Sequence, residues 1–180
     1  AETYQRLGDR ANALKHFFNY AFFSEKRNDL KNLASAYIGI GWTYYLAGDY
    51  PKAFDFYAKA ISLCKETRDK MNEAVALRKL SVWYMDKQQD DKALELLMKS
   101  AEINRERMNL AEHRANLARD YFNIGLVFTN KEDLAAARDF YTKSLKLFQA
   151  LQLKYELSDC YFNLGEVYKM EKQYEFAMAC

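Results

Sequence analysis

The sequence predicts an all-α fold, a solenoid of antiparallel helix pairs, and two observations carry this prediction. An alanine recurs at regular intervals, at Ala13, Ala53, Ala93, Ala137 and Ala177, and only the interval from Ala93 to Ala137 is longer than the others. Within each repeat the apolar residues fall at helical spacing, and the strict alternation typical of strands is missing. A nearly fixed period of about 40 residues is typical of repeat proteins, in which each unit stacks on its neighbours.

The expected helices follow from polar clusters that interrupt the apolar pattern, such as Gly48-Asp49 and Gln88-Gln89-Asp90. Three aspartates, Asp49, Asp90 and Asp133, are placed to cap or charge the start of a second helix. We expect helices over 9–27, 30–47, 50–66, 70–87, 90–107, 111–130, 133–150, 154–171 and 174–180. They form a single domain over 1–180, with repeats near 1–33, 34–73, 74–117, 118–157 and 158–180, the first and last partial.

A second set of positions repeats in phase with the alanines. Ahead of each later alanine, always at the same distance, stands a small residue, namely Gly41, Ser81, Gly125 or Gly165. One helical turn after each of these comes an aromatic: Tyr44, Tyr84, Phe128 or Tyr168. We expect the small residue of the first helix to face the alanine of the second, so that the two backbones approach closely.

The bulk composition excludes several classes of partner. Half of the 180 residues are hydrophobic, and 27 Lys and Arg stand against 25 Asp and Glu, for a net charge of +2. Such a nearly neutral composition does not predict the strongly basic surface that binds nucleic acid or an anionic membrane, so neither is expected as a partner. The uncharged run 32–48 lies in register with the repeat and is expected to form a buried helix. No signal peptide is visible, and a cytoplasmic location is expected.

The repeated pattern resembles the tetratricopeptide repeat (TPR) family, which carries a large apolar residue, then Leu-Gly, Tyr, Ala, an aromatic and Ala. The second repeat matches it as Tyr37, Ile40-Gly41, Tyr44, Ala53, Tyr57 and Ala60. The resemblance implies a right-handed superhelical array. The usual TPR period is shorter, about 34 residues with a closing proline, so longer helices must absorb the extra residues here. Kinesin light chains, polarity adaptors and bacterial peptide-pheromone receptors all have long TPR repeats, and the branch stays open.

The resemblance also implies that the first helix of each repeat lines a concave groove for a partner. The matching positions are Ile38, Trp42, Tyr45, Arg78, Val82, Met85, Phe122, Asn123, Leu126, Phe162, Asn163 and Glu166. Apolar residues at several of these exclude the carboxylate clamp of chaperone-binding TPRs. In some branches asparagines at such positions bond the backbone of an extended peptide, a task that suits an amide. The alternative is that the aromatics pack on the neighbouring repeat and the asparagines are surface residues.

These features favour a protein- or peptide-binding scaffold with no cofactor. One alternative is a peptide-gated regulatory domain of a larger signalling or transcription protein. Another is an enzyme, such as the phosphatase-like bacterial relatives, which would need a catalytic element that the sequence does not show. The two histidines, His16 and His113, lie in different repeats, and neither an HExxH motif nor a phosphate-binding loop is present.

The remaining expectations concern the cysteines and the two ends of the array. Cys64, Cys160 and Cys180 are too few and too widely spaced for a disulfide framework, and we expect reduced thiols without metal. We also expect the chain to be part of a longer array, with apolar surfaces at both ends and end-to-end self-association or a loosely ordered C-terminus. The expected exposed residues are Phe17, Phe18, Tyr20, Tyr174, Phe176 and Met178.

Overall fold

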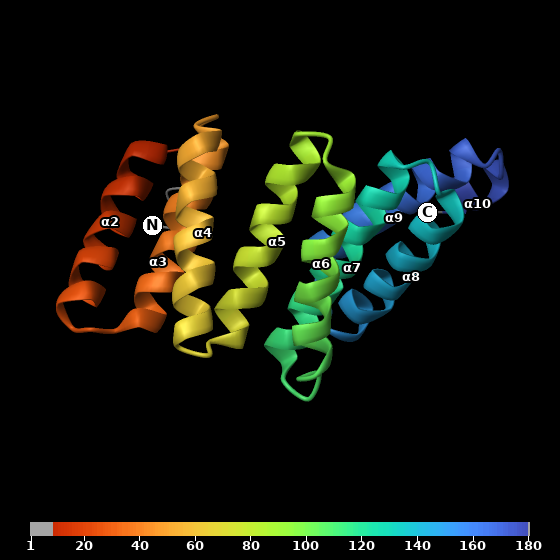
Figure 1. Ribbon diagram of the computed structural model, residues 1–180. Helices are drawn as coiled ribbons and strands as arrows, with labels where there is room; N and C mark the ends of the chain where they lie inside the picture. The colour runs from red at the N-terminus through yellow and green to blue at the C-terminus, as the bar shows by residue number, and fades with distance from the viewer. Residues whose placement is uncertain (1–8, 180) are drawn as a thin grey trace. The chain divides into compact units, whose positions relative to one another are not determined.

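The computed structural model of the protein describes residues 9–179, and in this range it contains nine α-helices and no strand (Figure 1). They are α2 (Arg10–Lys26), α3 (Leu30–Leu46), α4 (Tyr50–Glu66), α5 (Lys70–Asp86), α6 (Asp90–Arg105), α7 (Ala111–Asn130), α8 (Leu134–Ala150), α9 (Lys154–Met170) and α10 (Tyr174–Ala179). The predicted boundaries agree closely with these ranges. The all-α array of helix pairs is therefore confirmed.

The chain divides into two compact units, whose described residues are 9–83 and 84–179. In the first unit α3 packs against both α2 and α4. In the second unit α7 packs against α6 and α8, and α9 packs against α8 and α10. In these pairs each helix contacts the one that follows it in the chain, as the repeat predicts (Figure 1).

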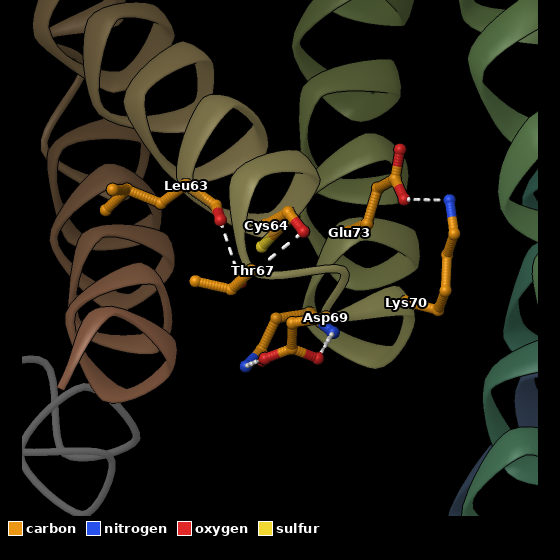
Figure 2. Close-up of polar contacts among 7 residues, drawn as sticks. Leu63, Cys64, Thr67, Asp69, Lys70 and Glu73 are labelled. Carbon is orange, nitrogen blue, oxygen red and sulfur yellow. Dashed lines mark hydrogen bonds and ion pairs between the residues drawn. The ribbon is translucent and has the colours of Figure 1, made fainter.

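The length of the repeat comes from its helices. Both α3 and α4 have 17 residues, and only a short connection separates one helix from the next. Figure 2 shows the connection between α4 and α5, where the Thr67 hydroxyl donates to the carbonyl of Leu63 at 2.8 Å. The middle residue, Arg68, has a left-handed backbone with φ of 54°.

The same connection also satisfies the end of α4. The amide of Asp69 donates to the carbonyl of Cys64 at 2.8 Å. The last carbonyls of a helix lack partners within the helix, and a bond of this kind supplies one. The chain therefore turns without the closing proline of shorter TPRs.

Capping aspartates begin several helices. Asp49 and Asp133 cap α4 and α8 as predicted, accepting from the backbone N–H groups of Lys52 and Ala136 at 3.3 and 3.1 Å. Asp90 does not cap α6, because it is already the first residue of that helix. The preceding N-cap residue, Gln89, makes no capping bond with its side chain. At the start of α6, Asp90 therefore contributes its charge in the first turn, where carboxylates favour the positive end of the helix dipole.

The longer interval between Ala93 and Ala137 has a structural origin in α7. The connection before α7 covers residues 106–110, and α7 itself has 20 residues. The extra length lies at its N-terminal end, so His113 sits inside the helix. The equivalent positions in the two preceding repeats are the capping residues Asp29 and Asp69.

Two of the predicted small residues, Gly41 and Gly125, lie at close helix contacts, but the nearest neighbour of each is a tyrosine ring and not the predicted alanine. A Cβ atom added to Gly125 would lie 2.6 Å from Cε1 of Tyr141. One added to Gly41 would lie 2.8 Å from Tyr57 and 3.2 Å from the carbonyl oxygen of Ala53. Both tyrosines are completely buried. The glycines therefore leave room for a ring that fills the space between the paired helices.

These two tyrosines occupy the same repeat position but differ in their hydroxyls. The hydroxyl of Tyr141 lies 3.2 Å from that of Thr129, whereas the Tyr57 hydroxyl has no hydrogen-bond partner among residues 9–179. We expect Tyr141→Phe to lower the free energy of unfolding by about 1 kcal/mol, because it removes a buried hydrogen bond. Tyr57→Phe is expected to be neutral or stabilising, because it removes an unsatisfied polar atom. Urea unfolding of the two variants tests this, and equal losses would contradict it.

The predicted apolar ends are exposed with one exception. Phe18, Tyr20, Tyr174, Phe176 and Met178 are each at least 40% exposed, as expected. Phe17 is buried, which corrects the prediction. Its ring lies where a Cβ atom on Gly39 would stand, only 2.3 Å away. The glycine on α3 thus makes the space that buries Phe17.

The structure also bears on the expectations for the cysteines and for a membrane-spanning helix. Cys64 and Cys160 are free and buried, as expected, and burial raises the pKa of the Cys64 thiol to about 12. Cys180 lies outside the described residues. Within 9–179 no helix is long and apolar enough to cross a membrane.

Candidate functional site

Two of the predicted groove residues in the first unit, Ile38 and Arg78, are buried and do not lie on the surface. Ile38 is 8% exposed and packs in a cluster with Ala60 and Ala76. Arg78 is 7% exposed. Both were expected to line the groove, and burial corrects that expectation. For Ile38 the reason is the size of its neighbours, because two alanines let the helices approach until the isoleucine side chain is covered.

Two other predicted residues of the first unit, Trp42 and Tyr45, belong to a half-buried aromatic surface. The rings of Trp42 and Tyr45, one turn apart on α3, stack with their centroids 5.0 Å apart and their planes at 13°. The ring of Tyr50 meets that of Tyr45 edge-on at 5.7 Å. We call the set the aromatic patch; its members are Trp42, Tyr45, Tyr50, Phe54 and Trp83.

The aromatic patch joins three helices. The ring of Phe54 on α4 lies 5.2 Å from that of Trp83 on α5. The indole N–H of Trp83 donates to the carbonyl of Tyr50 at 3.1 Å. Tyr50, Phe54 and Trp83 were not among the predicted site residues. The available signal was the placing of the chain's two tryptophans, which stand almost one repeat apart.

A cation lies directly on this patch. The Nζ atom of Lys79 on α5 is 3.4 Å from the ring centroid of Trp42. An ammonium over an indole face is attracted by the negative charge of the π-electrons. The patch therefore offers flat, polarisable rings and one positive charge. Val82, also predicted for the groove, is half-buried on the same helix.

Most of the predicted apolar residues in the second unit serve packing. Met85 packs on the cluster around Leu97. Phe122 lies 5.6 Å from the ring of Tyr141 and also packs on the cluster that contains Cys160. Leu126 packs on the cluster of Tyr141. These contacts favour the alternative interpretation for the three residues, namely packing between neighbouring repeats.

The two predicted asparagines differ from each other. The side-chain amide of Asn163 donates to the carbonyl of Asp159 at 2.8 Å, within its own helix. Asn123 is half-buried, and within 9–179 its amide has no hydrogen-bond partner. Phe162 is 69% exposed, and Glu166 pairs with Lys169 at 3.5 Å on the surface of the same helix. The two asparagines therefore differ in that only the Asn163 amide is engaged by another residue among those the structure describes.

A buried polar network between α6 and α7 was missed by sequence reasoning. Ser100 and Asn104 donate to the two carboxylate oxygens of Asp120, at 2.9 and 2.7 Å. The Asn104 oxygen then faces Nδ1 of His113 at 2.9 Å, so this nitrogen carries the proton. Burial and the nearby Arg107 cation lower the pKa of His113. All four side chains are buried, which gives Ser100 no route to a substrate and makes the network a structural element.

Comparison with known families identifies the fold. The tetratricopeptide repeat model matches residues 32–106 and 72–150. The chain belongs to the tetratricopeptide repeat family. Its TPR repeats coincide with the helix pairs, since the two matched segments together span α3 to α8. A search of curated proteins finds no sequence that matches.

Solved structures with the same fold share little sequence with this TPR protein. BtubC (BKLC) from P. vanneervenii is 22% identical with a TM-score of 0.83, over 99% of this chain and 73% of that one. A putative kinesin light chain from Podosopora anserina with nearly identical TPR-like repeats is 15% identical with a TM-score of 0.70, over 99% and 86%. NprR in complex with its cognate peptide NprX is 20% identical with a TM-score of 0.70, over 92% and 47%.

Proposed function

We propose that this TPR protein is a scaffold that binds a protein or an extended peptide, and that the aromatic patch is its principal contact surface. The observation that carries the proposal is the stack of Trp42 and Tyr45 with Lys79 at 3.4 Å over the indole. These groups come from the first helices of two neighbouring repeats, where TPR proteins meet their partners. They remain half-buried instead of closing into the core. The proposal assigns no catalytic role to the chain.

The chemistry of the patch fits a peptide. Tryptophan and tyrosine dominate binding energy at protein interfaces because they bury large areas at a small cost in side-chain entropy. Their stacking and the Trp83 bond to Tyr50 hold the rings in place before a partner arrives. A preorganised surface loses less entropy on binding, and this raises the affinity for each contact made.

A test can use peptides selected on the chain from a random peptide display library. Both tryptophans lie in the aromatic patch, so their fluorescence reports on the patch itself. We expect Trp42→Ala to weaken the binding of the selected peptides by about 30-fold, because the substitution removes an aromatic side chain from the contact surface. Tyr155→Ala is the matched control, because Tyr155 is 89% exposed on α9 and should leave the affinity unchanged. Equal affinity for folded Trp42→Ala and the parent would overturn the proposal.

The likeness to NprR, solved with its peptide NprX, favours a second candidate, a peptide-gated regulatory domain. A gating domain must change its conformation or dynamics when the peptide binds, because a ligand shifts only states that it binds unequally. Hydrogen exchange of the backbone amides distinguishes the two. Peptide-induced changes in residues 84–179 favour the regulatory domain, and changes confined to 30–83 favour the scaffold.

A further inference from the structure

Both faces of the Trp42 indole are covered by other side chains of the same unit. On one face the ring of Tyr45 is stacked, with the centroids 5.0 Å apart and the planes at 13°. The Nζ atom of Lys79 lies 3.4 Å from the indole centroid, which is van der Waals contact with the ring. An ammonium at that distance would overlap the Tyr45 ring if both were on the same side, so the two groups occupy opposite faces. The indole therefore has no open face for a partner.

The two covering groups differ in how firmly the patch holds them. The ring of Tyr45 also meets that of Tyr50 edge-on at 5.7 Å, and the Tyr50 carbonyl accepts from the indole N–H of Trp83. Tyr45 is thus fixed in a set of contacts that spans α3, α4 and α5. A lysine reaches its ring on a flexible aliphatic stem, and its strongly hydrated ammonium regains water when it leaves. Lys79 is therefore the group that a partner can displace.

The chemistry of the covering group indicates what can replace it. The face of an indole carries negative charge density, which attracts a cation and repels a carboxylate. A guanidinium is planar, stacks on aromatic rings and is more weakly hydrated than an ammonium. An exchange of the Lys79 ammonium for a partner's guanidinium returns the strongly hydrated cation to water and stacks the weakly hydrated one on Trp42. Arginine is therefore the side chain best suited to take this face.

We infer that the indole face under Lys79 is the subsite for an arginine of the bound protein or peptide, and that Lys79 closes this subsite until the partner arrives. The inference rests on the proposed function, because it specifies the partner's chemistry at the aromatic patch. Lys79 acts in it as an internal competitor, since one face cannot hold two cations at once. The affinity of the patch then depends on how tightly the side chain at position 79 holds the ring.

Substitutions at position 79 test this competition, with synthetic copies of the peptides selected on the chain and tryptophan fluorescence as the readout. Lys79→Met should tighten peptide binding about two- to fivefold, because it removes a cation–π contact that the peptide must otherwise break. Lys79→Arg should weaken binding, because its guanidinium stacks on the indole more favourably than the ammonium does. Lys59→Met is the matched control: it removes the same charge from a contact at 5.1 Å with Phe56, outside the patch, and should bind like the parent.

The peptide side of the contact is tested with citrulline, which has the shape of arginine without its charge. Each arginine of the tightest peptide is replaced by citrulline in turn. One replacement should weaken binding to the parent by about fivefold, the effect of losing a cation–π contact. The same replacement should have a smaller effect on Trp42→Ala, because the two side chains that it uncouples are in contact.

The direction of the changes distinguishes this inference from a partner that brings a carboxylate to Lys79. In that case Lys79→Met would weaken binding and Lys79→Arg would preserve it, and the inference would be overturned. Selected peptides without arginine, or equal affinities for the parent and both variants, would overturn it as well, while a loss of binding in Trp42→Ala would leave the proposed function standing. If Trp42→Ala also bound like the parent, the proposed function would fail and the inference with it.

Discussion

Gly125→Leu is expected to lower the free energy of unfolding by about 3 kcal/mol, since it forces a side chain into a close-packed core. Even the first added atom, Cβ, would stand 2.6 Å from the ring of Tyr141. That ring is completely buried and its hydroxyl is held by Thr129, so it has little freedom to move aside. The midpoint of urea unfolding measures the loss, and an unchanged midpoint would show that Gly125 is not at a close helix contact.

A double variant checks the cause of this loss. In the third repeat Ser81 replaces the glycine and Leu97 stands at the position of the tyrosine. Gly125→Ser combined with Tyr141→Leu copies that pair into the fourth repeat. We expect the combined loss to be smaller than the sum of the two single losses by about 1 kcal/mol, because the residues are in contact. If the losses of the two single variants simply added, the steric clash would not lie between the side chains at positions 125 and 141.

The fold could be predicted closely because its signals are local and repeated. The alanine period indicated the helix pairs, and polar clusters with capping aspartates indicated the boundaries. Asp90 was predicted to cap or charge the start of its helix, and it does the second, because it is the first residue of α6 and the capping position is the adjacent Gln89. Helix caps are therefore predictable from sequence to within about one position, which suffices for the fold.

Burial at individual site positions was less predictable. The repeat register places Ile38 and Trp42 on the same helix one turn apart, yet only Ile38 is buried. The difference comes from Ala60 and Ala76, whose small size closes the space around Ile38. Phe17 was misplaced for a similar reason, since the absence of a Cβ atom on Gly39 opens its pocket. Such effects depend on neighbours that are distant in sequence, and a single helix pattern does not contain them.

The buried polar network had a signal in the sequence that went unused. Asp120 stands where the other repeats hold Ala36, Ala76 and Cys160. Asn104 occupies the interior position held by Cys64 and Phe148 in neighbouring repeats. Polar residues at two interior positions of adjacent helices indicate a hydrogen-bonded pair. The extra turn of α7 then places His113 within reach of Asn104.

Asn104→Leu is expected to lower the free energy of unfolding by about 3–5 kcal/mol, although it changes the side-chain volume little. The amide serves two neighbours at once, donating to Asp120 and accepting from His113. Without it a buried carboxylate oxygen loses a donor and a buried imidazole N–H loses its acceptor. Each loss costs about 1–3 kcal/mol, and more for a charged group, because water does not replace the missing partner.

The matched control makes the same substitution at the far end of the next helix. Asn130 is exposed, and its amide donates to Asp90 at 3.3 Å on the surface. Asn130→Leu should change stability by less than about 0.5 kcal/mol, because water replaces the lost bond. Thermal or urea unfolding compares the two variants. If Asn104→Leu matched this control, the network would contribute no stability, and the polar residues between α6 and α7 would need a role other than joining those helices.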